Sequence, residues 1–441
     1  MKSPIATGKW IFPGLALILL LSGCSLLPSI HPPRLTGDRA FIAYWPPKAD
    51  NHQITLAVKD NIDMKGMVTS AGSRHLARNA SPAYADAACL SIARQRNVLF
   101  VGKANLSEFA VAPSGFNGYY GTPHSPLGDS GNLLPGGSSC GSAVAVALGK
   151  ADVAFGTDTA GSVRVPAAWC GVAGLKTTHG LVPLDGVFPI EPFHLDTVGP
   201  IAKDIAHLVE GMDLLQDGFV VLYARAVAAN PTPRTIRIGR LTVPGTDPKI
   251  DQAVDMALAK TGFQVIPLDG EFLKEWEQAK EDGNTIAAAG VWISDQKYLY
   301  ALGVSARTRS AIRLGRMAYR SNYDEAVARK TQWQNRLKEI FKAVDFIALP
   351  TMQTTPKAIP TFRIGAMEAR MLQLQNTVAV NFAGNPALAL PIPLQDADVA
   401  VTSLQLIGPW LSEAPLLNAG RLVEVAVSPK TTGQASAPVA Q

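Results

Sequence analysis

The chain has 441 residues, of which 47% are hydrophobic, and its formal net charge at pH 7 is +5. This length and apolar content predict a globular, enzyme-sized protein with a substantial core, built as one large domain or two ordinary ones. The basic residues are dispersed along the sequence, which excludes the linear basic cluster typical of nucleic-acid-binding proteins, so we expect no nucleic-acid partner.

The N-terminus has the pattern of a secretory signal. Lys2 and Lys9 precede an apolar run over residues 10–21. This run is shorter than the about 20 apolar residues that a membrane-spanning helix needs. The pattern therefore predicts a signal peptide over residues 1–23.

The apolar run ends in Leu21-Ser22-Gly23-Cys24, which resembles the lipobox of bacterial lipoproteins. The resemblance implies that Cys24 is lipidated, becomes the first mature residue and anchors the protein in a membrane. Ser25, in place of Asp, favours the outer membrane, so we expect the protein on the periplasmic side of the cell envelope. The alternative is a plain signal peptide that is cleaved nearby and has an incidental cysteine. Residues 24–50, rich in Pro and polar residues, are predicted to form the anchor and a tether.

Three cysteines remain after Cys24, namely Cys89, Cys140 and Cys170. Because their number is odd, at least one thiol stays unpaired in a compartment that permits disulfides. They lack the spacing of a metal site and no histidine cluster lies nearby, so we predict buried small hydrophobic side chains and no metal.

The folded domain is predicted to begin with a short apolar strand over residues 54–58, which places Lys59 at its end. A helix is predicted over residues 84–96 and a buried strand over residues 98–102. A strand, a helix and a strand in this order imply a parallel crossover unit.

Asn105 and Glu108 are interpreted as a capping pair for a following helix. A long loop rich in Gly, Ser, Pro and Asn then covers residues 117–142, and loops of this length inside a compact domain are usually functional. A helix of small residues is predicted over residues 143–148 and a strand over residues 153–156.

The rest of the chain alternates helices and strands. The middle, roughly residues 235–345, is predicted to contain one strand over 235–241 and helices rich in Ala, Lys, Glu and Gln, without a chemical motif. The later predicted elements are strands over 345–351, 387–393 and 399–407, a helix over 411–425 and a disordered tail over 428–441. Because no internal repeat or Gly-Ser linker interrupts the chain, we predict one mixed α/β domain over residues 51–427.

Two serine-bearing loops are candidates for nucleophilic catalysis, residues 136–142 (GGSSCGS) and 156–164 (GTDTAGSVR). Their glycines let the backbone turn sharply and approach a ligand closely. A serine nucleophile needs a proton acceptor and donors aimed at the developing oxyanion, and the backbone N–H groups of Thr159, Ala160 and Gly161 are candidates for these donors. Neither loop ends in Gly-Lys-Ser/Thr, which excludes a P-loop.

Ser139 is a competing nucleophile, because Gly137-Ser138-Ser139-Cys140-Gly141 satisfies the G-x-S-x-G pattern of the α/β-hydrolase elbow. Asp185 and either His194 or His207 follow in the order that an esterase triad requires. An elbow, however, joins a strand to a helix, and residues 133–136 (LLPG) do not have the pattern of a strand. This context disfavours Ser139.

Three blocks of the sequence together resemble the amidase signature family. They are Ala57-Val58-Lys59-Asp60-Asn61, the GGSSCGS loop, and GTDTAGSVRVPA, which contains Ser162. Further segments over 169–180, 196–200, 349–351 and 381–387 are similar to the same family. The similarity is dense over about 54–204, returns over 345–408 and is weak between these ranges. The resemblance implies a single large α/β domain whose central mixed β-sheet is covered by helices on both faces.

The resemblance also implies a Ser-cisSer-Lys triad, with Lys59 as general base, Ser138 as relay and Ser162 as nucleophile, and a cis peptide bond between Gly137 and Ser138. A lysine acts as a base only when its amine is neutral, which requires desolvation or cationic neighbours. The position of Lys59 after an apolar strand fits this need. The implied reaction passes through an acyl-enzyme and needs no metal or organic cofactor.

Several neighbours of the triad are expected to support it. Ser139 is predicted to hydrogen-bond within its loop or to cap the next helix, and Asp158 and Arg164 to brace the nucleophile turn. Two residues depart from the family pattern: Cys140 replaces the usual Gly of the first serine loop, and Ala160 replaces a frequent Gly of the second. Ala160 adds a methyl group to the oxyanion turn and suggests a shaped pocket.

The sequence therefore favours an amidase that cleaves a small carboxylic amide to an acid and ammonia or an amine. The alternatives are an esterase that uses Ser139, a glutaminase-like amidotransferase subunit, which the same family contains, and a binding protein without activity. The secretory pattern argues against the amidotransferase subunit, whose tRNA partner is cytosolic, and the occupied triad argues against an inactive protein.

Overall fold

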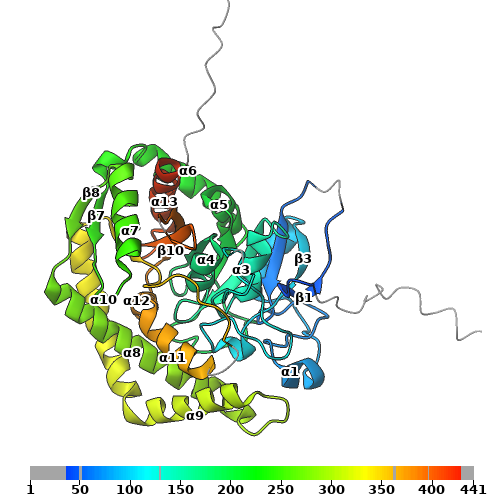
Figure 1. Cartoon of the computed structure of the whole chain (residues 1–441). Helices are drawn as coiled ribbons and strands as arrows, with labels where there is room; N and C mark the ends of the chain where they lie inside the picture. Colours follow the sequence, from blue (N-terminus) through cyan, green and yellow to red (C-terminus); the bar gives the residue numbers. More distant parts are fainter. Residues whose placement is uncertain (1–35, 49–51, 129–130, 361–363, 396, 429–441) are drawn as a thin grey trace, which may run out of the picture.

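The computed structural model describes residues 36–48, 52–128, 131–360, 364–395 and 397–428 (Figure 1). The predicted signal peptide over 1–23, the lipidation site Cys24 and the tail after residue 428 lie outside the described residues. The predicted tether is described only over residues 36–48. No helix in the described ranges combines the length and the apolar character needed to cross a membrane.

The described strands form one eleven-stranded sheet in the order β1-β3-β2-β4-β6-β5-β10-β11-β9-β7-β8. Their bounds are β1 Phe41–Tyr44, β2 Thr55–Lys59, β3 Leu99–Ala104, β4 Val153–Asp158, β5 Ala173–Lys176, β6 Thr197–Ala202, β7 Arg237–Arg240, β8 Gln264–Pro267, β9 Phe346–Pro350, β10 Ala387–Pro393 and β11 Val401–Ile407. The sheet is mixed. β2 pairs in parallel with β3 and β4, the central strands β4, β6, β5, β10, β11 and β9 are antiparallel, and β7 is parallel to both β8 and β9.

The α-helices of the described residues are α1 Arg74–Asn79, α2 Ser91–Gln95, α3 Cys140–Ala147, α4 Arg164–Cys170, α5 Ile205–Asp213, α6 Phe219–Ala229, α7 Pro248–Thr261, α8 Gly270–Asp295, α9 Ala306–Ser321, α10 Tyr323–Ala343, α11 Ile364–Leu374, α12 Val378–Ala383 and α13 Glu413–Val427. One face of the sheet is covered by α5, α7 and α13, and the other by α3 and α4. The long helix α8 packs against α9, α10 and α12 at the side of the domain (Figure 1). The predicted single domain with a mixed sheet between helices is thus confirmed.

Side-chain alternation explains why α3 lies close to the sheet. Leu56 and Val58 of β2 belong to the core under α5 and α13, whereas Ala57 between them belongs to the core under α3. The α3 face therefore carries small side chains, and α3 itself has the sequence CGSAVAVA. A Cβ atom on Gly141 of α3 would come within 2.3 Å of Ala40 O and of Asn105 N. This tight packing holds the start of α3, and with it the first serine loop, against the sheet.

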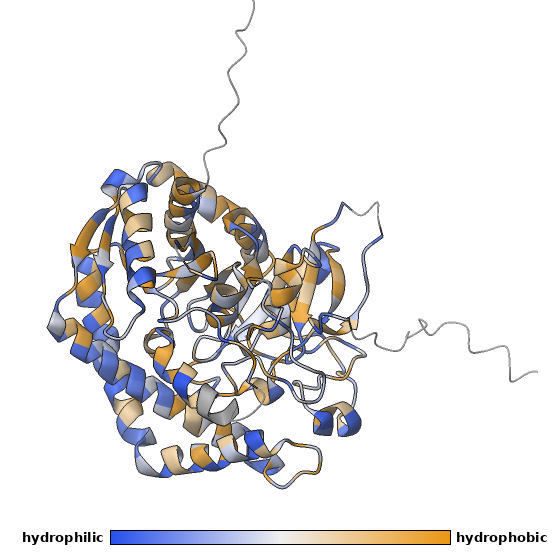
Figure 2. Cartoon of the chain, in the orientation of Figure 1, coloured by the Kyte–Doolittle hydropathy of each residue, from blue (hydrophilic) through white to orange (hydrophobic). Residues whose placement is uncertain are grey.

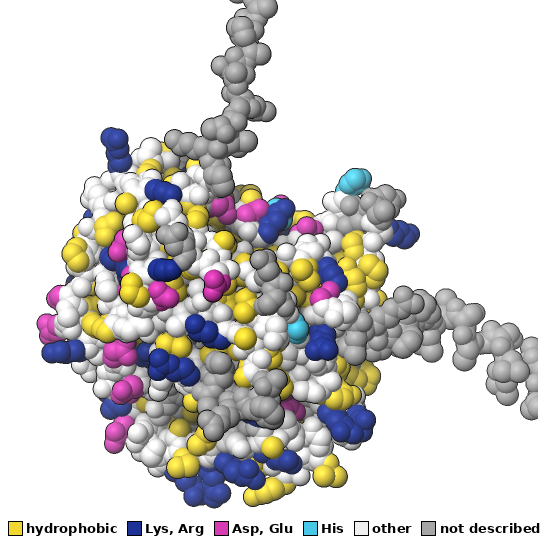
Figure 3. All heavy atoms as spheres, viewed as in Figure 1, with side chains coloured by type: hydrophobic (Ala, Val, Ile, Leu, Met, Phe, Trp, Pro, Cys, Tyr) yellow, Lys and Arg dark blue, Asp and Glu magenta, His cyan; other side chains and the backbone are white. Residues whose placement is uncertain are grey.

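The outer helices have a different character. In Figure 2, α8, α9 and α10 mix hydrophilic with hydrophobic residues, as expected for helices with one face in solvent. Lys and Arg side chains gather in Figure 3 along the lower edge, where α9 lies in Figure 1. The sequence of α9 contains five arginines and no acidic residue. The positive charge is thus less dispersed than the linear sequence indicates, because helical spacing brings residues three and four apart onto one side.

Most of the predicted strands and the last helix are present with small shifts in their ends. The strand predicted over 387–393 coincides with β10, and the predicted parallel crossover is confirmed by the pairing of β2 with β3. The prediction of one helix over 84–96 is wrong, because only a 3-10 turn over Ala88–Leu90 and the short α2 form there.

The predicted capping pair is also wrong. The Asn105 side chain donates to Arg39 O and Gly121 O, and the carboxylate of Glu108 accepts from Ser73, Ser305 and Thr308. The segment that follows is a 3-10 turn over Glu108–Ala110 rather than an α-helix.

Candidate active site

Lys59 is the last residue of β2, and its side chain is fully buried. Its amine Nζ donates hydrogen bonds to Ser138 Oγ at 2.8 Å and to Thr157 Oγ1 at 2.7 Å, with a longer contact of 3.4 Å to Thr157 O. Because β2 and β4 are adjacent parallel strands, their carboxyl ends bring Lys59 and Thr157 together. The first serine loop supplies Ser138 from the side of α3.

Burial lowers the pKa of Lys59 from its usual value to about 7. An ammonium group that leaves water loses its hydration, which favours the neutral amine. The carboxylates of Asp158 and Asp196 oppose this effect only in part. Near neutral pH a substantial fraction of Lys59 is therefore uncharged and able to accept a proton.

Ser138 lies in a loop that is anchored on both sides. The Gly137–Ser138 peptide bond is cis, which confirms the geometry that the family resemblance implies. Gly137 N donates to Pro113 O at 2.7 Å, and Ser138 O accepts from Ser107 N at 3.2 Å. Ser138 is fully buried, so Lys59 holds its hydroxyl in a water-poor environment.

Ser162 lies in the turn between β4 and α4 and is partly exposed. Its carbonyl oxygen accepts from Ser139 N at 3.2 Å, which ties the two serine loops together. The Ser162 hydroxyl makes no hydrogen bond with the described residues, so the contact between Ser138 and Ser162 that a relay requires is not formed here. Hydrogen bonds of this kind often tighten only when substrate binds.

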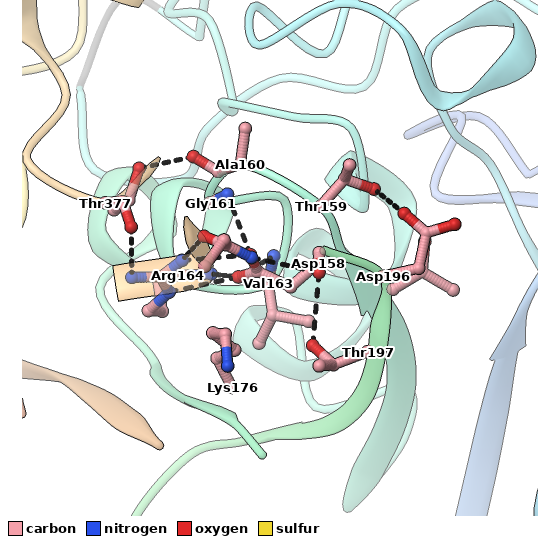
Figure 4. A network of polar contacts seen from close by, with 12 residues as sticks. Asp158, Thr159, Ala160, Gly161, Val163, Arg164, Lys176, Asp196, Thr197 and Thr377 are labelled. Atoms are coloured by element: carbon pink, nitrogen blue, oxygen red, sulfur yellow. Dashed lines mark hydrogen bonds and ion pairs between the residues drawn. The ribbon is translucent and has the colours of Figure 1, made fainter. Parts of the chain in front are cut away.

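Asp158 organises the turn that leads to Ser162 (Figure 4). Its carboxylate accepts from Gly161 N at 2.7 Å and from Val163 N at 3.1 Å. Because the Gly161 N–H already donates to Asp158, it is not available to a substrate. The N–H groups of Thr159, Ala160 and Ser162 donate no hydrogen bond to the described residues, so these are better candidates for oxyanion donors than Gly161.

Arg164 is the first residue of α4 and pairs with Asp158 in the interior. Its guanidinium Nε and Nη2 contact Asp158 Oδ2 at 3.1 Å and Oδ1 at 2.9 Å, and both side chains are fully buried. Burial alone would raise the pKa of Asp158, but the charge of Arg164 and its hydrogen bonds lower that pKa well below the usual range. The remaining donors of Arg164 reach Thr377 O, Gln405 Oε1 and Asn381 Oδ1. The pair thus links the nucleophile turn to the C-terminal third of the chain.

Two further contacts fix the same turn from its sides (Figure 4). Thr159 Oγ1 donates to Asp196 Oδ1 at 2.6 Å, and Thr377 Oγ1 donates to Ala160 O at 2.5 Å. A Cβ atom on Gly161 would lie 2.3 Å from Thr377 Oγ1, so Gly161 must remain a glycine for this contact to form. The turn is therefore held by its own carboxylate, by Asp196 just before β6 and by the segment before α12.

A cavity of about 310 Å³ opens at Ser162. Thr159, Ala160 and Gly137 line it at the serine loops, and helices α8, α9 and α11 close the other side. Its wall is mostly apolar, with Ala287, Val291, Ala311 and Leu314 among the lining residues. The cavity is large enough for a small organic molecule and brings such a molecule to Ser162.

The structure gives no support to Ser139 as an esterase nucleophile. Ser139 is fully buried, and its hydroxyl donates to Thr157 O at 3.3 Å. His207 pairs with Asp204 and His194 lies near Glu191, whereas Asp185 is exposed. The Ser139 side chain neither caps α3 nor hydrogen-bonds within its own loop, because its hydroxyl donates to Thr157 O of β4, so neither of the two roles predicted for it is observed.

The three cysteines of the described residues, Cys89, Cys140 and Cys170, are all free and buried, in agreement with the prediction. Burial raises the pKa of the Cys140 thiol to about 12. This thiol therefore stays protonated near neutral pH although it lies in the loop beside Lys59.

Some residues of the site were not identified from the sequence. Thr157 is the second hydrogen-bond partner of the Lys59 amine, and Thr377, Asn381 and Gln405 complete the shell around Asp158 and Arg164. Asn381 lies in a segment that resembles the family, which was a usable signal. No pattern in the sequence indicated a role for Thr377 or Gln405.

Comparisons with known proteins identify the family and relatives of this chain. A sequence model of the family described as Amidase matches residues 51–417. The chain is 31% identical to a subunit of the glutamyl-tRNA(Gln) amidotransferase of Natronomonas pharaonis, over 83% of this chain and 94% of that protein. It is also 31% identical to the 2-amino-5-chloromuconic acid deaminase of Comamonas testosteroni over 85% of this chain and 81% of that one.

Solved structures show the same fold. A structure from work on the evolutionary origins of an s-triazine catabolic enzyme superposes with a TM-score of 0.75 at 26% identity, covering 86% of this chain and 84% of the other. A 6-aminohexanoate cyclic dimer hydrolase bound to its substrate superposes with a TM-score of 0.74 at 23% identity, covering 85% of each chain.

Replacement of Arg164 tests the role of the buried ion pair. Arg164→Met leaves the carboxylate of Asp158 buried without its cation, which costs about 3–5 kcal/mol of unfolding free energy. Chemical denaturation followed by circular dichroism measures this loss. Arg237→Met, which removes an exposed pair with Asp345, is the control and is expected to have a much smaller effect because solvent screens that pair. Equal losses in the two variants would contradict the bracing role.

Proposed function

Because the chain belongs to the amidase family, we propose that it hydrolyses the amide bond of a small molecule, with Ser162 as nucleophile, Ser138 as proton relay and Lys59 as general base. The observation that supports these roles most directly is the buried Lys59 amine, whose pKa is about 7 and which lies 2.8 Å from Ser138 Oγ. Lys59 is buried and forms no ion pair with the described residues, which is unfavourable for stability. A lysine in this state beside two serine loops therefore favours a chemical role over a structural one.

The proposed reaction begins with proton transfer. Neutral Lys59 accepts a proton from Ser138, which takes one from Ser162 as Ser162 Oγ attacks the amide carbonyl carbon. The N–H groups of Ala160 and Ser162, with Thr159, are proposed to stabilise the negative charge on the carbonyl oxygen. The protonated Lys59 then returns its proton through Ser138 to the leaving nitrogen, and ammonia or an amine departs.

Water completes the cycle. The acyl group remains as an ester on Ser162, and Ser138 with Lys59 activates a water molecule that attacks the ester carbonyl carbon. A carboxylic acid leaves, and Ser162 regains its proton. Every step uses side chains or backbone groups of this chain.

A glutaminase-like amidotransferase subunit is the second candidate, favoured by the similarity to proteins of the glutamyl-tRNA(Gln) amidotransferases. The secretory pattern of residues 1–23 argues against it. We further propose that Cys24 is lipidated and holds the enzyme on the periplasmic side of a bacterial envelope, which rests on the lipobox sequence alone.

The pH dependence of amide hydrolysis tests the role of Lys59. Since the neutral amine is the active form, kcat/KM is expected to rise about tenfold per pH unit below pH 7 and to reach a plateau above it. Lys59→Met is expected to lower kcat/KM by about 10²- to 10⁴-fold, and Ser162→Ala by more because it removes the nucleophile. A panel of aliphatic, aromatic and peptide amides, with glutamine included, provides the substrates.

His194→Ala and His207→Ala serve as controls for the same assay. Both should retain the wild-type rate and pH profile, because neither histidine contacts the proposed triad. Full activity in Lys59→Met, or loss of activity in either histidine variant, would contradict the proposed roles.

Replacement of Cys24 tests the anchor. When the full chain is expressed in a bacterial host, the wild type is expected to incorporate labelled palmitate and to sediment with membranes. Cys24→Ala should lose the label and the membrane association. Equal sedimentation of the two proteins would argue for attachment by other means.

A further inference from the structure

Three polar side chains on the cavity wall make no hydrogen bond with the described residues. They are Ser162, the proposed nucleophile, and two carboxamides, Gln375 and Asn284. Asn284 of α8 is partly exposed, whereas Gln375 is only 2% exposed and its Nε2 is a buried donor without an acceptor among the described residues. Buried polar groups are nearly always hydrogen-bonded in native proteins, so an exception in the wall of a cavity calls for an explanation.

The backbone around Gln375 is held firmly, although its side chain has no partner in the described part of the chain. Gln375 N donates to Met371 O at 3.1 Å, and Gln375 forms a bridge with Met352. Asn376 N donates to Thr351 O, and Thr377 binds Ala160 O in the nucleophile turn. The backbone that carries this carboxamide is therefore fixed, and it lies only two residues before Thr377, which contacts the nucleophile turn. A side chain held in this way is suited to act as a preorganised binding group.

The charged side chains of the same wall already satisfy one another or the protein. Glu108 accepts from Ser73, Ser305 and Thr308. Arg307 pairs with Glu368 at 2.9 Å and donates to Phe116 O. These charged groups are thus engaged with the protein, and the apolar remainder of the wall makes it costly to desolvate a charge of either sign.

We propose that Gln375 binds the substrate, and that this substrate is an uncharged, mainly apolar amide with a second amide group. A second amide offers both a carbonyl oxygen and an N–H, which match the donor and the acceptor of a carboxamide side chain. The apolar part of the substrate packs against α8 and α9, where Ala287, Val291 and Leu314 line the cavity. This inference rests on the proposed function, because it assumes that the scissile amide lies at Ser162.

Three probes separate the contributions of the second amide and of charge. N-acetyl-L-leucinamide is neutral and has two amides, 4-methylpentanamide has one, and N-succinyl-L-leucinamide adds a carboxylate. Calorimetric binding to the full-length Ser162→Ala protein needs no turnover and gives a Kd for each probe. The same probes as substrates of the wild type give kcat/KM.

Gln375→Leu replaces the carboxamide by an apolar side chain of similar size. In the Ser162→Ala background it is expected to weaken binding of N-acetyl-L-leucinamide about 5- to 100-fold and to leave the Kd of 4-methylpentanamide within about twofold. The melting temperature should not fall, because the Gln375 side chain forms no hydrogen bond with the described part of the chain that the substitution could remove. Gln373→Leu, at an exposed position two residues earlier, is the matched control and should change neither quantity.

The outcomes separate this inference from the proposed function. Equal weakening of both neutral probes, unchanged binding in Gln375→Leu, tighter binding of the succinyl probe, or no binding of N-acetyl-L-leucinamide would overturn the role of Gln375. Selective weakening by Gln375→Leu, combined with a wild type that hydrolyses no amide, would support the binding role while it contradicts the proposed hydrolysis.

Discussion

The amine of Lys59 is enclosed where β2 ends inside the protein, and the rest of the site follows from this burial. Removed from bulk solvent, the amine has a pKa of about 7, and its hydrogen bonds go to Ser138 and Thr157. The small side chains on the α3 face of the sheet, such as Ala57, let the first serine loop approach the amine. The close packing around Lys59 thus also makes its amine a proton acceptor near neutral pH, because burial lowers its pKa.

The second constraint is the buried pair of Asp158 and Arg164. Asp158 shapes the turn around Ser162 by accepting from three backbone N–H groups, while Arg164 joins that turn to Thr377 and Gln405 near the other end of the chain. The base and the nucleophile are consequently placed by different parts of the sequence around one sheet. This division explains why α8 and α9 can form part of the cavity wall without contributing to the triad.

The elements predicted correctly from the sequence are those that depend on neighbouring residues in the chain. The strand predicted over 387–393 matches β10 at both ends, and the serine motifs located the two loops of the site. The helix expected over 84–96 failed because Ala87 N donates to Asp63 O and Ala88 N to Asp185 O, which holds the backbone extended up to the 3-10 turn. The hydrogen bonds of Thr377, and the lack of a partner for the Gln375 carboxamide among the described residues, could not be predicted, since both depend on segments brought together only by the fold.

The central claim is that a neutral, buried Lys59 activates Ser162. A fluorophosphonate probe reports on it directly, because the probe bonds covalently to an activated serine hydroxyl and its position is found by peptide mapping. The account predicts an adduct on Ser162 whose rate of formation rises with pH through about 7, following the neutral fraction of Lys59. An adduct on Ser139, or a rate on Ser162 that does not change between pH 5 and about 9, would contradict it.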